Sequence, residues 1–468
     1  MVIYVEIKRY SPIVTKIKIL MDKSKQATLE LGTKPVGKLL MQYALPAIAA
    51  MTAASLYNMT DSIFIGQGCG ALAISGLAIT FPLQNLGAAF GAGVGVGAST
   101  CISVKLGQKD YKTAEHVFGN AVTLNLIIGI AFGVIALLFL NPILRFFGAS
   151  DATLPYAREY MVVTLAGNVI SHMFFGMNAI LRAASKPRSA MTASIMTVIL
   201  NAILSPIFIW PLHMGIRGAA LATIIAQAIV LTWQLRIFSN PQCIVHFKRG
   251  IYRPVGRIIK NIIAIGMSPF AMNLCSCIVI IFINNALTRH GGDLAVGAFG
   301  ICNKIAFIFI MINMGMNQGM FPIAGYNYGA RNYDRLLTAL KYTMIVAVCI
   351  TTLGFIIAQT IPYECARLFT TDDNLIKIAE HAIRINMLVF PVVGAQMVCT
   401  GFFQSIGKAK VSMLLSLSRQ LLFFLPLLLV LPNYYQVDGV WFAQPISDLI
   451  SAIVAVTMLT KYIQKLKA

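Results

Sequence analysis

Long hydrophobic stretches recur along the whole chain, separated by short segments that carry charges and turn-forming residues. Each stretch reaches the length of about 20 residues that an α-helix needs to cross a bilayer. The pattern therefore predicts an all-α polytopic membrane protein. Its twelve expected transmembrane helices are residues 39–65, 71–103, 116–141, 157–182, 188–212, 216–236, 258–288, 294–325, 338–361, 379–405, 410–432 and 438–461.

The two halves of the chain resemble each other at a spacing of about 222 residues. Residues 45–114 align with residues 268–336, and the loop LGQKDYKTA at 106–114 corresponds to YGARNYDRL at 328–336. The matched positions include Pro46 with Pro269, Gly93 with Gly315 and Gly97 with Gly319. Because each half holds six predicted helices, both insert in the same orientation, as in the parallel repeats of secondary transporters. We expect two six-helix bundles that enclose a cleft.

This repeat predicts five regions. They are a cytoplasmic N-terminal tail (1–38), an N-terminal six-helix lobe (39–236), a cytoplasmic linker (237–257), a C-terminal six-helix lobe (258–461) and a cytoplasmic C-terminal tail (462–468). The first 38 residues lack the apolar core and the cleavage site of a signal peptide. Met21 is an alternative start, so residues 1–20 are either an extension or a tail.

Composition and charge agree with a membrane protein. Hydrophobic residues make up 58% of the chain and charged residues 11%, against about 25% charged in soluble proteins. The net charge is +21, and most Lys and Arg lie in the N-terminal tail and in the loops after even-numbered helices. By the positive-inside rule, both termini are cytoplasmic. The basic excess thus sets the orientation in the inner (plasma) membrane and does not indicate nucleic-acid binding.

Several chemistries are excluded by context. The run GAAFGAGVGVGAS (87–99) fits a dinucleotide pattern, but it lies inside an apolar span, where small residues let helices approach closely. No Walker motif indicates ATP as an energy source, and the six histidines are scattered. The nine cysteines lie mostly in apolar spans and behave as small hydrophobic residues. We therefore expect neither an enzyme, nor a metal site, nor a cofactor.

A single carboxylate, Asp61, stands in the first apolar span. Placing it inside the membrane costs about 2.5–3.5 kcal/mol on insertion scales, and the usual reason to keep such a group is ion or proton traffic. Tyr57 and Asn58 lie one helical turn earlier on the same face. The alternative is that Asp61 lies near the outer headgroups and is only solvated.

These features together resemble the multidrug and toxic compound extrusion (MATE) family. The resemblance rests on the Asp61 helix with Pro46, on GLAITFP (76–82), on ASKP (184–187) and on AGYNYGA (324–330). It implies a V-shaped, monomeric antiporter that exports cationic or amphiphilic small molecules in exchange for H⁺ or Na⁺. Its partners would be these substrates and membrane lipids. The alternative is a flippase for lipids or lipid-linked saccharides, from a related transporter group.

In the family branch that this chain resembles, the N-terminal lobe carries the coupling ion. The matching positions are Asp61, Tyr57, Asn178, Asn201 and Thr223. The family's second carboxylate is replaced here by Ser205, which weakens Na⁺ binding, since hard cations prefer charged oxygen ligands. The sequence therefore favours H⁺ and leaves Na⁺ open. Protonation of Asp61 would bend the first helix near Pro46, where the helical hydrogen-bond ladder is interrupted.

The C-terminal lobe has its own charged residues within spans, namely Lys304, Arg419 and Asp448. We expect an ion pair that joins Asp448 to Lys304 or Arg419, because charges inside membranes generally pair. The alternative is a substrate contact or a second proton relay. Segments 267–285 and 382–404 contain no carboxylate, so the cation site of another family branch is not expected. Gln318, Gln396 and Gln404 are polar candidates for the cavity wall.

Overall fold

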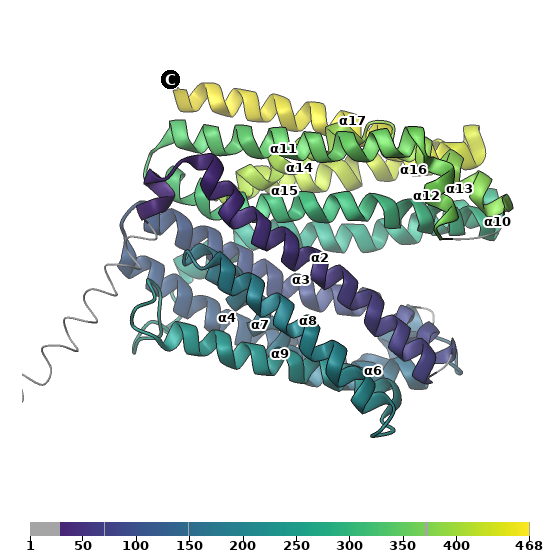
Figure 1. Cartoon of the computed structure of the whole chain (residues 1–468), viewed down its shortest axis with the longest axis horizontal. Helices are drawn as coiled ribbons and strands as arrows, with labels where there is room; N and C mark the ends of the chain where they lie inside the picture. The colour runs from purple at the N-terminus through teal and green to yellow at the C-terminus, as the bar shows by residue number, and fades with distance from the viewer. Residues whose placement is uncertain (1–28, 70, 148, 370–372, 468) are drawn as a thin grey trace, which may run out of the picture.

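The computed structural model describes residues 29–69, 71–147, 149–369 and 373–467, and every regular element in these ranges is a helix (Figure 1). It leaves out the side chains of residues 54–63, of several positions between 66 and 78, and of a few isolated residues farther along the chain. Asp61 and Tyr57 therefore have a described backbone, but their side chains are outside the described part.

The first half of the chain forms eight labelled helices. They are α2 (Val36–Cys69), α3 (Ala71–Gly107), α4 (Tyr111–Leu138), α5 (Leu140–Phe146), α6 (Leu154–Ala166), α7 (Asn168–Ala183), α8 (Pro187–Ile209) and α9 (Gly215–Ser239). The second half consists of α10 (Gly256–Gly329), α11 (Tyr333–Thr360), α12 (Pro362–Arg367), α13 (Asp373–Asn386), α14 (Phe390–Ser405), α15 (Ala409–Leu417), the π-helix η1 (Ser418–Phe424), α16 (Leu425–Val430) and α17 (Pro432–Lys467).

Membrane-spanning length is common among these helices. Within the described residues, nine helices are long and apolar enough to cross a membrane, and the bent pairs α6–α7 and α13–α14 bring the number to eleven. The element labelled α10 supplies two of them, Gly256–Leu287 and Leu294–Gly329, because its helix is broken at Gly292, where φ is 68°. Helix α2, the first expected span, has 34 residues and so extends about 51 Å.

Two expected spans differ from the prediction because they are broken. Residues 157–182 and 379–405 were each expected as one helix, but α6 and α7 meet at 57° and α13 and α14 at 53°. Gly167 interrupts the first pair, and a Cβ atom there would lie 2.5 Å from Ile224 Cγ2. In the second pair, Pro391 lacks the N–H that would continue the helical ladder.

The sequence repeat extends to the backbone conformation of the turns. Left-handed residues other than glycine are uncommon, yet equivalent positions of the two halves share that conformation. The pairs are Lys109 (φ 60°) with Arg331 (φ 58°), Ser185 (φ 61°) with Gly407 (φ 75°), and His213 (φ 50°) with Gln436 (φ 50°). The two halves are therefore two bundles with the same chain path.

Glycines allow the two bundles to interlock. A Cβ atom on Gly319 of α10 would lie 2.6 Å from Ala44 Cα of α2, so the two helices touch through their backbones. The equivalent crossing joins α3 to the first part of α10, where a Cβ on Gly93 would lie 3.1 Å from the carbonyl oxygen of Gly266. The small residues of the run at 87–99 therefore let α3 and α10 approach closely, as the sequence predicted.

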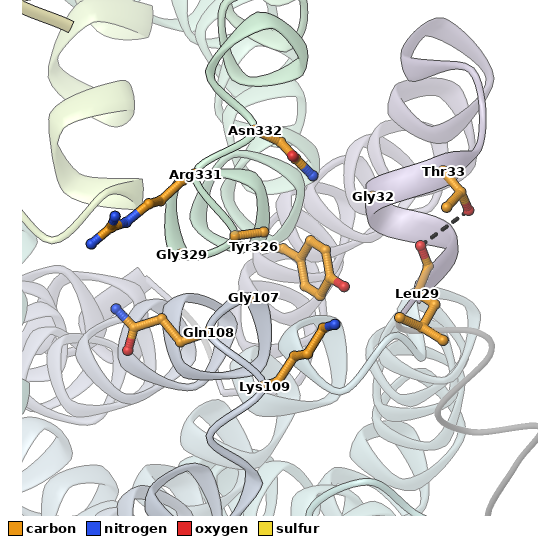
Figure 2. A pocket seen from close by; sticks show the side chains of 11 residues that line it. Leu29, Gly32, Thr33, Gly107, Gln108, Lys109, Tyr326, Gly329, Arg331 and Asn332 are labelled. Atoms are coloured by element: carbon orange, nitrogen blue, oxygen red, sulfur yellow. Dashed lines mark hydrogen bonds between the residues drawn. The ribbon is translucent and has the colours of Figure 1, made fainter.

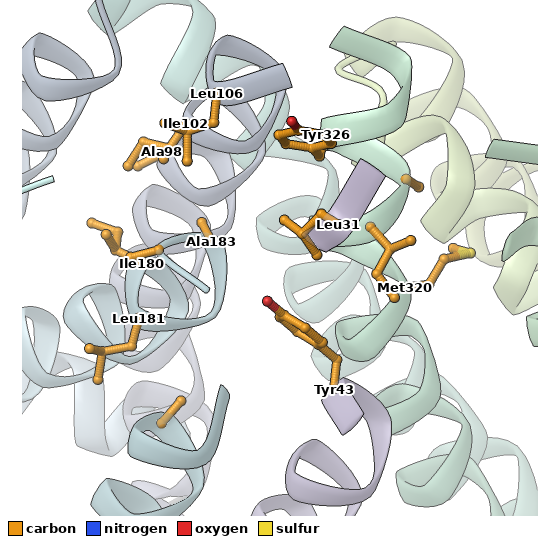
Figure 3. Close-up of a cluster of buried hydrophobic side chains, with 14 of the residues drawn as sticks. Leu31, Tyr43, Ala98, Ile102, Leu106, Ile180, Leu181, Ala183, Met320 and Tyr326 are labelled. Carbon is orange, nitrogen blue, oxygen red and sulfur yellow. The ribbon is translucent and has the colours of Figure 1, made fainter. Parts of the chain in front are cut away.

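Among the described side chains, one hydrophobic core cluster is shared by both halves, and it lies toward one end of the molecule. The largest buried cluster includes Leu31, Ile102, Met320 and Tyr326 and so takes residues from both halves (Figure 3). Tyr462, near the other terminus, packs against it. The remaining clusters in the described part each belong to one half. We call the end with Leu31 and Tyr462 the joined end; away from it the bundles diverge (Figure 1).

Candidate functional site

Three predicted site residues form one hydrogen-bonded chain between α8 and α9. Ser205 donates to the side-chain oxygen of Asn201 at 3.3 Å, and Asn201 Nδ2 donates to Thr223 Oγ1 at 3.0 Å. Thr223 in turn donates to the carbonyl oxygen of Ala219 at 3.1 Å. Asn201 and Ser205 are almost fully buried. The structure therefore brings these three predicted site residues together, and their part in ion coupling stays a prediction.

The helical period explains this arrangement. Asn201 and Ser205 are four residues apart on α8, so they occupy one face. That face packs on α9, which presents Thr223. Each of the three side chains is neutral, and their donors run in one direction along the chain of bonds. Such a network offers no formal negative charge to a metal cation.

Asp61 and Tyr57 lie on α2, which packs against α8. Their side chains fall outside the described residues, so their predicted contact with the Asn201 network stays a prediction. Pro46 is described: it is half-buried inside α2, between Ala44 and Ile48, the residues that touch Gly319 and Gly315 of α10. The missing N–H of Pro46 therefore falls where α2 crosses the other bundle.

Asn178 belongs to a different network from Asn201. Arg182 Nη1 donates to Asn178 Oδ1 at 2.6 Å, while Asn178 Nδ2 donates to the carbonyl oxygen of Ala190 at 3.1 Å and to Ser194 Oγ at 3.2 Å. Ser194 and Asn201 are seven residues apart on α8, or about 10 Å along the helix. Asn178 thus fastens the end of α7 to the start of α8.

Arg182 is the residue that the sequence analysis missed, because it was counted only as a loop charge. The usable signal was its spacing of four residues from Asn178, which places both side chains on one face of α7. The guanidinium lies in the last turn of α7, where a positive charge is favourable. It also occupies the only oxygen of the Asn178 side chain. A second cation at that oxygen would meet like charge.

His172 is a second buried polar group that the sequence did not single out. It is 1% exposed on α7. Its ring stacks near Phe132, and Gly91 of α3 leaves the space for it, since a Cβ there would lie 3.0 Å from His172 Cα.

In the C-terminal half, the predicted ion pair joins Asp448 to Arg419. Arg419 Nε donates to Asp448 Oδ1 at 2.7 Å, and Gln444 Nε2 donates to both carboxylate oxygens at 3.3 and 3.2 Å. Asp448 is 4% exposed on α17, and Arg419 lies on the π-helix η1. The pair therefore ties η1 to α17.

Lys304 does not take part in this pair. Its side chain is exposed, and its Nζ lies 5.6 Å from the centre of the Phe369 ring. Of the three glutamines, Gln396 and Gln404 are buried on α14, and Gln318 is half-buried. Gln318 Nε2 lies 3.5 Å from the sulfur of Met51 on α2, so it sits between the bundles. Their place in a cavity wall stays a prediction.

No group of three or more His, Cys, Asp or Glu in the described ranges could hold a metal ion. A protein-family model described as MatE matches residues 46–207 and 265–430, that is, a large part of each six-helix bundle. The chain belongs to the MatE family. Members of this family are membrane transporters that need no cofactor, so this protein is a multi-pass membrane transporter and not an enzyme.

Two multidrug export proteins are similar to this chain over almost its whole length. The chain is 26% identical to the multidrug export protein MepA of Staphylococcus haemolyticus, over 89% of this chain and 92% of that protein. It is 25% identical to MepA of Staphylococcus aureus strain MSSA476, over 90% of this chain and 93% of that protein.

Solved structures give the same result. The fold superposes with a TM-score of 0.89 on an outward-facing multidrug resistance MATE transporter, at 26% identity over 94% of this chain and 98% of that one. A transporter of the MOP superfamily from Pyrococcus furiosus gives a TM-score of 0.88 at 27% identity, over 94% of this chain and 98% of that one. The predicted fold of two six-helix bundles is thereby confirmed.

Proposed function

We propose that this MatE transporter is a secondary active multidrug efflux antiporter that exports cationic or amphiphilic compounds in exchange for H⁺. The observation that carries the proposal is the near full-length similarity to multidrug export proteins, combined with the shared fold. Substrates would be small organic molecules, and the transporter would act as a monomer among membrane lipids.

The choice of H⁺ over Na⁺ rests on the N-terminal bundle. The network of Asn201, Ser205 and Thr223 is neutral, and the oxygen of Asn178 already accepts from Arg182. These four positions therefore supply no charged oxygen that would bind Na⁺ tightly. A proton needs only one titratable group, and Asp61 on the adjacent α2 is the candidate.

The membrane orientation follows from charge. Among the described residues, the joined end carries Lys34 and Lys38, the basic loop 240–255 and the Lys-rich end of α17, so we place it on the cytoplasmic side of the plasma membrane. The bundles diverge toward the opposite, external side. This arrangement is consistent with the similarity to a transporter described as outward-facing.

In the mechanism that we propose, Asp61 binds a proton from the external side when the bundles diverge there. Loss of its charge changes how α2 packs on α8, and the break in the ladder at Pro46 lets α2 bend at its crossing with α10. Bending reduces the space in the N-terminal bundle and expels the bound compound outward. Release of the proton to the cytoplasm then resets the transporter.

The test uses purified protein in liposomes loaded with tetraphenylphosphonium, with a proton gradient and a sodium gradient imposed separately. We expect proton-driven efflux in the wild type and its loss in Asp61→Asn. The matched control is Asp110→Asn in a loop, because asparagine caps a helix as well as aspartate does. Efflux that only a sodium gradient drives would refute H⁺ coupling.

The flippase alternative has less support in the geometry. Holding lipid phosphates would require available Arg or Lys side chains in the central cavity. Arg419 is paired with Asp448, and Lys304 lies over Phe369. If no organic cation moves under either gradient while fluorescent lipid is translocated, the antiporter proposal fails.

A further inference from the structure

The segment that leads into α2 is bound by the opposite bundle. We call residues 29–35 the strap; residues 29–33 are helical, and Pro35 precedes α2. Leu31 of the strap is 1% exposed and lies in the core cluster shared by both halves, close to Tyr326 of α10 (Figure 3). A Cβ atom on Gly32 would lie 3.0 Å from the Tyr326 ring. The strap is thus part of the N-terminal half of the sequence, but its residues Leu31 and Gly32 pack against Tyr326 of the C-terminal half.

Arg335 of α11 forms most of the hydrogen bonds that hold the strap. Its guanidinium donates to the carbonyl oxygen of Leu31 at 3.2 Å, to that of Thr33 at 3.5 Å, and to that of Lys34. These are carbonyls at the end of the helical turn, where no intrahelical partner remains and a positive charge is favourable. Asn327 Nδ2 of α10 adds a bond of 3.0 Å to the Leu31 carbonyl.

The bundles touch backbone to backbone beside the strap. A Cβ on Gly325 of α10 would lie 2.9 Å from Ser103 Cβ of α3, and Gly107 and Gly329 face the opposite helix so closely that neither could carry a side chain. Figure 2 shows Leu29, Gly32 and Thr33 of the strap together with Tyr326, Gly107 and Gly329 around a pocket. The volume of this pocket is about 570 Å³. Opening the joined end would separate these same surfaces, and the strap crosses their boundary.

The second bundle has a counterpart to the strap. Residues 251–255 precede α10 as the strap precedes α2, and they too are held by the opposite bundle. Asn120 of α4 donates to the carbonyl oxygens of Ile251 and Arg253 at 3.4 and 3.2 Å and accepts from the Val255 N–H at 2.8 Å. Arg253 and Leu31 are equivalent in the repeat. The equivalent backbone carbonyl therefore accepts hydrogen bonds from the opposite bundle in both halves, although the donating side chains are not equivalent in the repeat.

We propose that Arg335 is a positioning residue for transport, which latches the strap of α2 onto the C-terminal bundle and must release it before the joined end opens. It acts through α2, the helix that carries Pro46 and Asp61, and touches no substrate. The inference rests on the proposed efflux function only for the direction of transport. The contact between Arg335 and the strap closes the joined end of the cleft whichever ion drives transport.

The test measures access to position 103 from the joined end. Ser103 is 2% exposed, so a Ser103→Cys reporter, in a background whose nine native cysteines are replaced by alanine, reacts slowly with an impermeant maleimide while that end is closed. We expect Arg335→Gln to raise the labelling rate about tenfold, a usual size for such a coupling. The control is Arg331→Gln, which removes a neighbouring charge that lines the same pocket. Its guanidinium lies outside the set of strap bonds described above, so this variant should label as the parent does.

A second variant disturbs the latch from the strap itself. Gly32→Ala pushes the strap away from Tyr326, whereas at Gly37 the added Cβ would make an ordinary contact of 3.5 Å with Tyr342. Gly32→Ala is expected to raise labelling of the reporter cysteine and Gly37→Ala to leave it unchanged. This pair keeps the proposal testable if Arg335→Gln does not fold.

Transport kinetics separate a latch from a purely structural role. A population shifted toward the open joined end lowers the apparent KM for substrate offered at that side and lowers the maximal rate, because resetting becomes harder. Fewer folded molecules would lower the maximal rate alone. Unchanged labelling and unchanged KM in folded Arg335→Gln and Gly32→Ala would overturn the latch, whether or not H⁺ proves to be the coupling ion.

Discussion

Arg182 donates a hydrogen bond of 2.6 Å to the side-chain oxygen of Asn178, one turn earlier on α7. Asn178 was expected among the residues that bind the coupling ion. In the structure its side-chain oxygen instead accepts a hydrogen bond from the positively charged guanidinium of Arg182. Its amide nitrogen is also used, by Ala190 and Ser194 of α8. Asn178 therefore joins two helices, and a metal cation at its oxygen would meet the positive charge of Arg182. Its part in ion coupling stays a prediction.

We accordingly expect Na⁺ to leave the stability of the purified protein unchanged. Any ion that binds only the folded state raises its unfolding temperature by mass action. Replacing choline chloride with sodium chloride at equal ionic strength should shift the midpoint by less than about 1 °C. A clear stabilisation by Na⁺ that disappears in Ser205→Ala would place a sodium site in the N-terminal network after all.

Removing Asp448 alone should be strongly destabilising. Asp448→Ala leaves the Arg419 guanidinium, which is only 21% exposed, without its carboxylate. Breaking a buried ion pair from one side costs about 3–5 kcal/mol. Thermal unfolding in detergent measures the loss, and Lys304→Ala, which breaks no ion pair in the described part, is the control.

The double replacement Arg419→Met with Asp448→Leu should recover much of that stability. Apolar side chains of similar size often replace a buried ion pair with little or no cost. If the double variant is as unstable as Asp448→Ala, the pair contributes more than mutual charge compensation. If it is stable but transports nothing, the pair serves transport, which was the alternative to a structural role.

Gly319 should tolerate no side chain. In Gly319→Ala the new Cβ would meet the backbone Cα and N atoms of Ala44 at 2.6 and 2.7 Å, and backbone cannot move aside as a flexible side chain can. Overpacking of this kind costs about 1–3 kcal/mol. Gly300→Ala on the same helix has nothing within 4 Å and should be neutral or stabilising. Equal unfolding temperatures for the two variants would refute the close crossing of α2 and α10.

Asp110 offers a prediction about pH outside the membrane. It caps α4, and its hydrogen bonds with Thr113, with Lys105 nearby, hold the pKa of its carboxyl below the ordinary 3.8. Because the folded state favours the charged form, the stabilisation is present at neutral pH and is lost as the pH falls through that lowered pKa. We expect Asp110→Ala to cost about 1 kcal/mol at neutral pH. The difference from wild type should shrink below pH 3.8.

The sequence predicted features that depend on residues close together in the chain better than contacts between residues far apart in it. Helix number and the repeat follow from local apolarity and from matching loops, and even the left-handed turns at Lys109 and Arg331 fall at matched positions. The grouping of Asn201 with Ser205 follows from helical spacing. The breaks at Gly167 and before Pro391 were missed, since both lie within continuous apolar segments.

Long-range partners could not be inferred in the same way. Nothing in the pattern tells whether Asp448 meets Arg419 or Lys304, because the choice depends on how η1 packs on α17. The grip of Arg335 on the strap joins residues about 300 positions apart through backbone carbonyls, which carry no sequence signal. The bond between Arg182 and Asn178 was within reach of the sequence, because the two residues are four apart on one helix, but Arg182 was counted only as a loop charge.

The most direct test of the central claim is whether substrate binding displaces a proton. Purified protein in weakly buffered detergent solution is titrated with tetraphenylphosphonium, and the proton release is followed with a pH indicator. An antiporter whose substrate and proton compete through Asp61 should release protons on binding, and Asp61→Asn should bind the compound without releasing any. Binding by the wild type without proton release, or equal release from Asp61→Asn, would contradict coupling through this carboxylate.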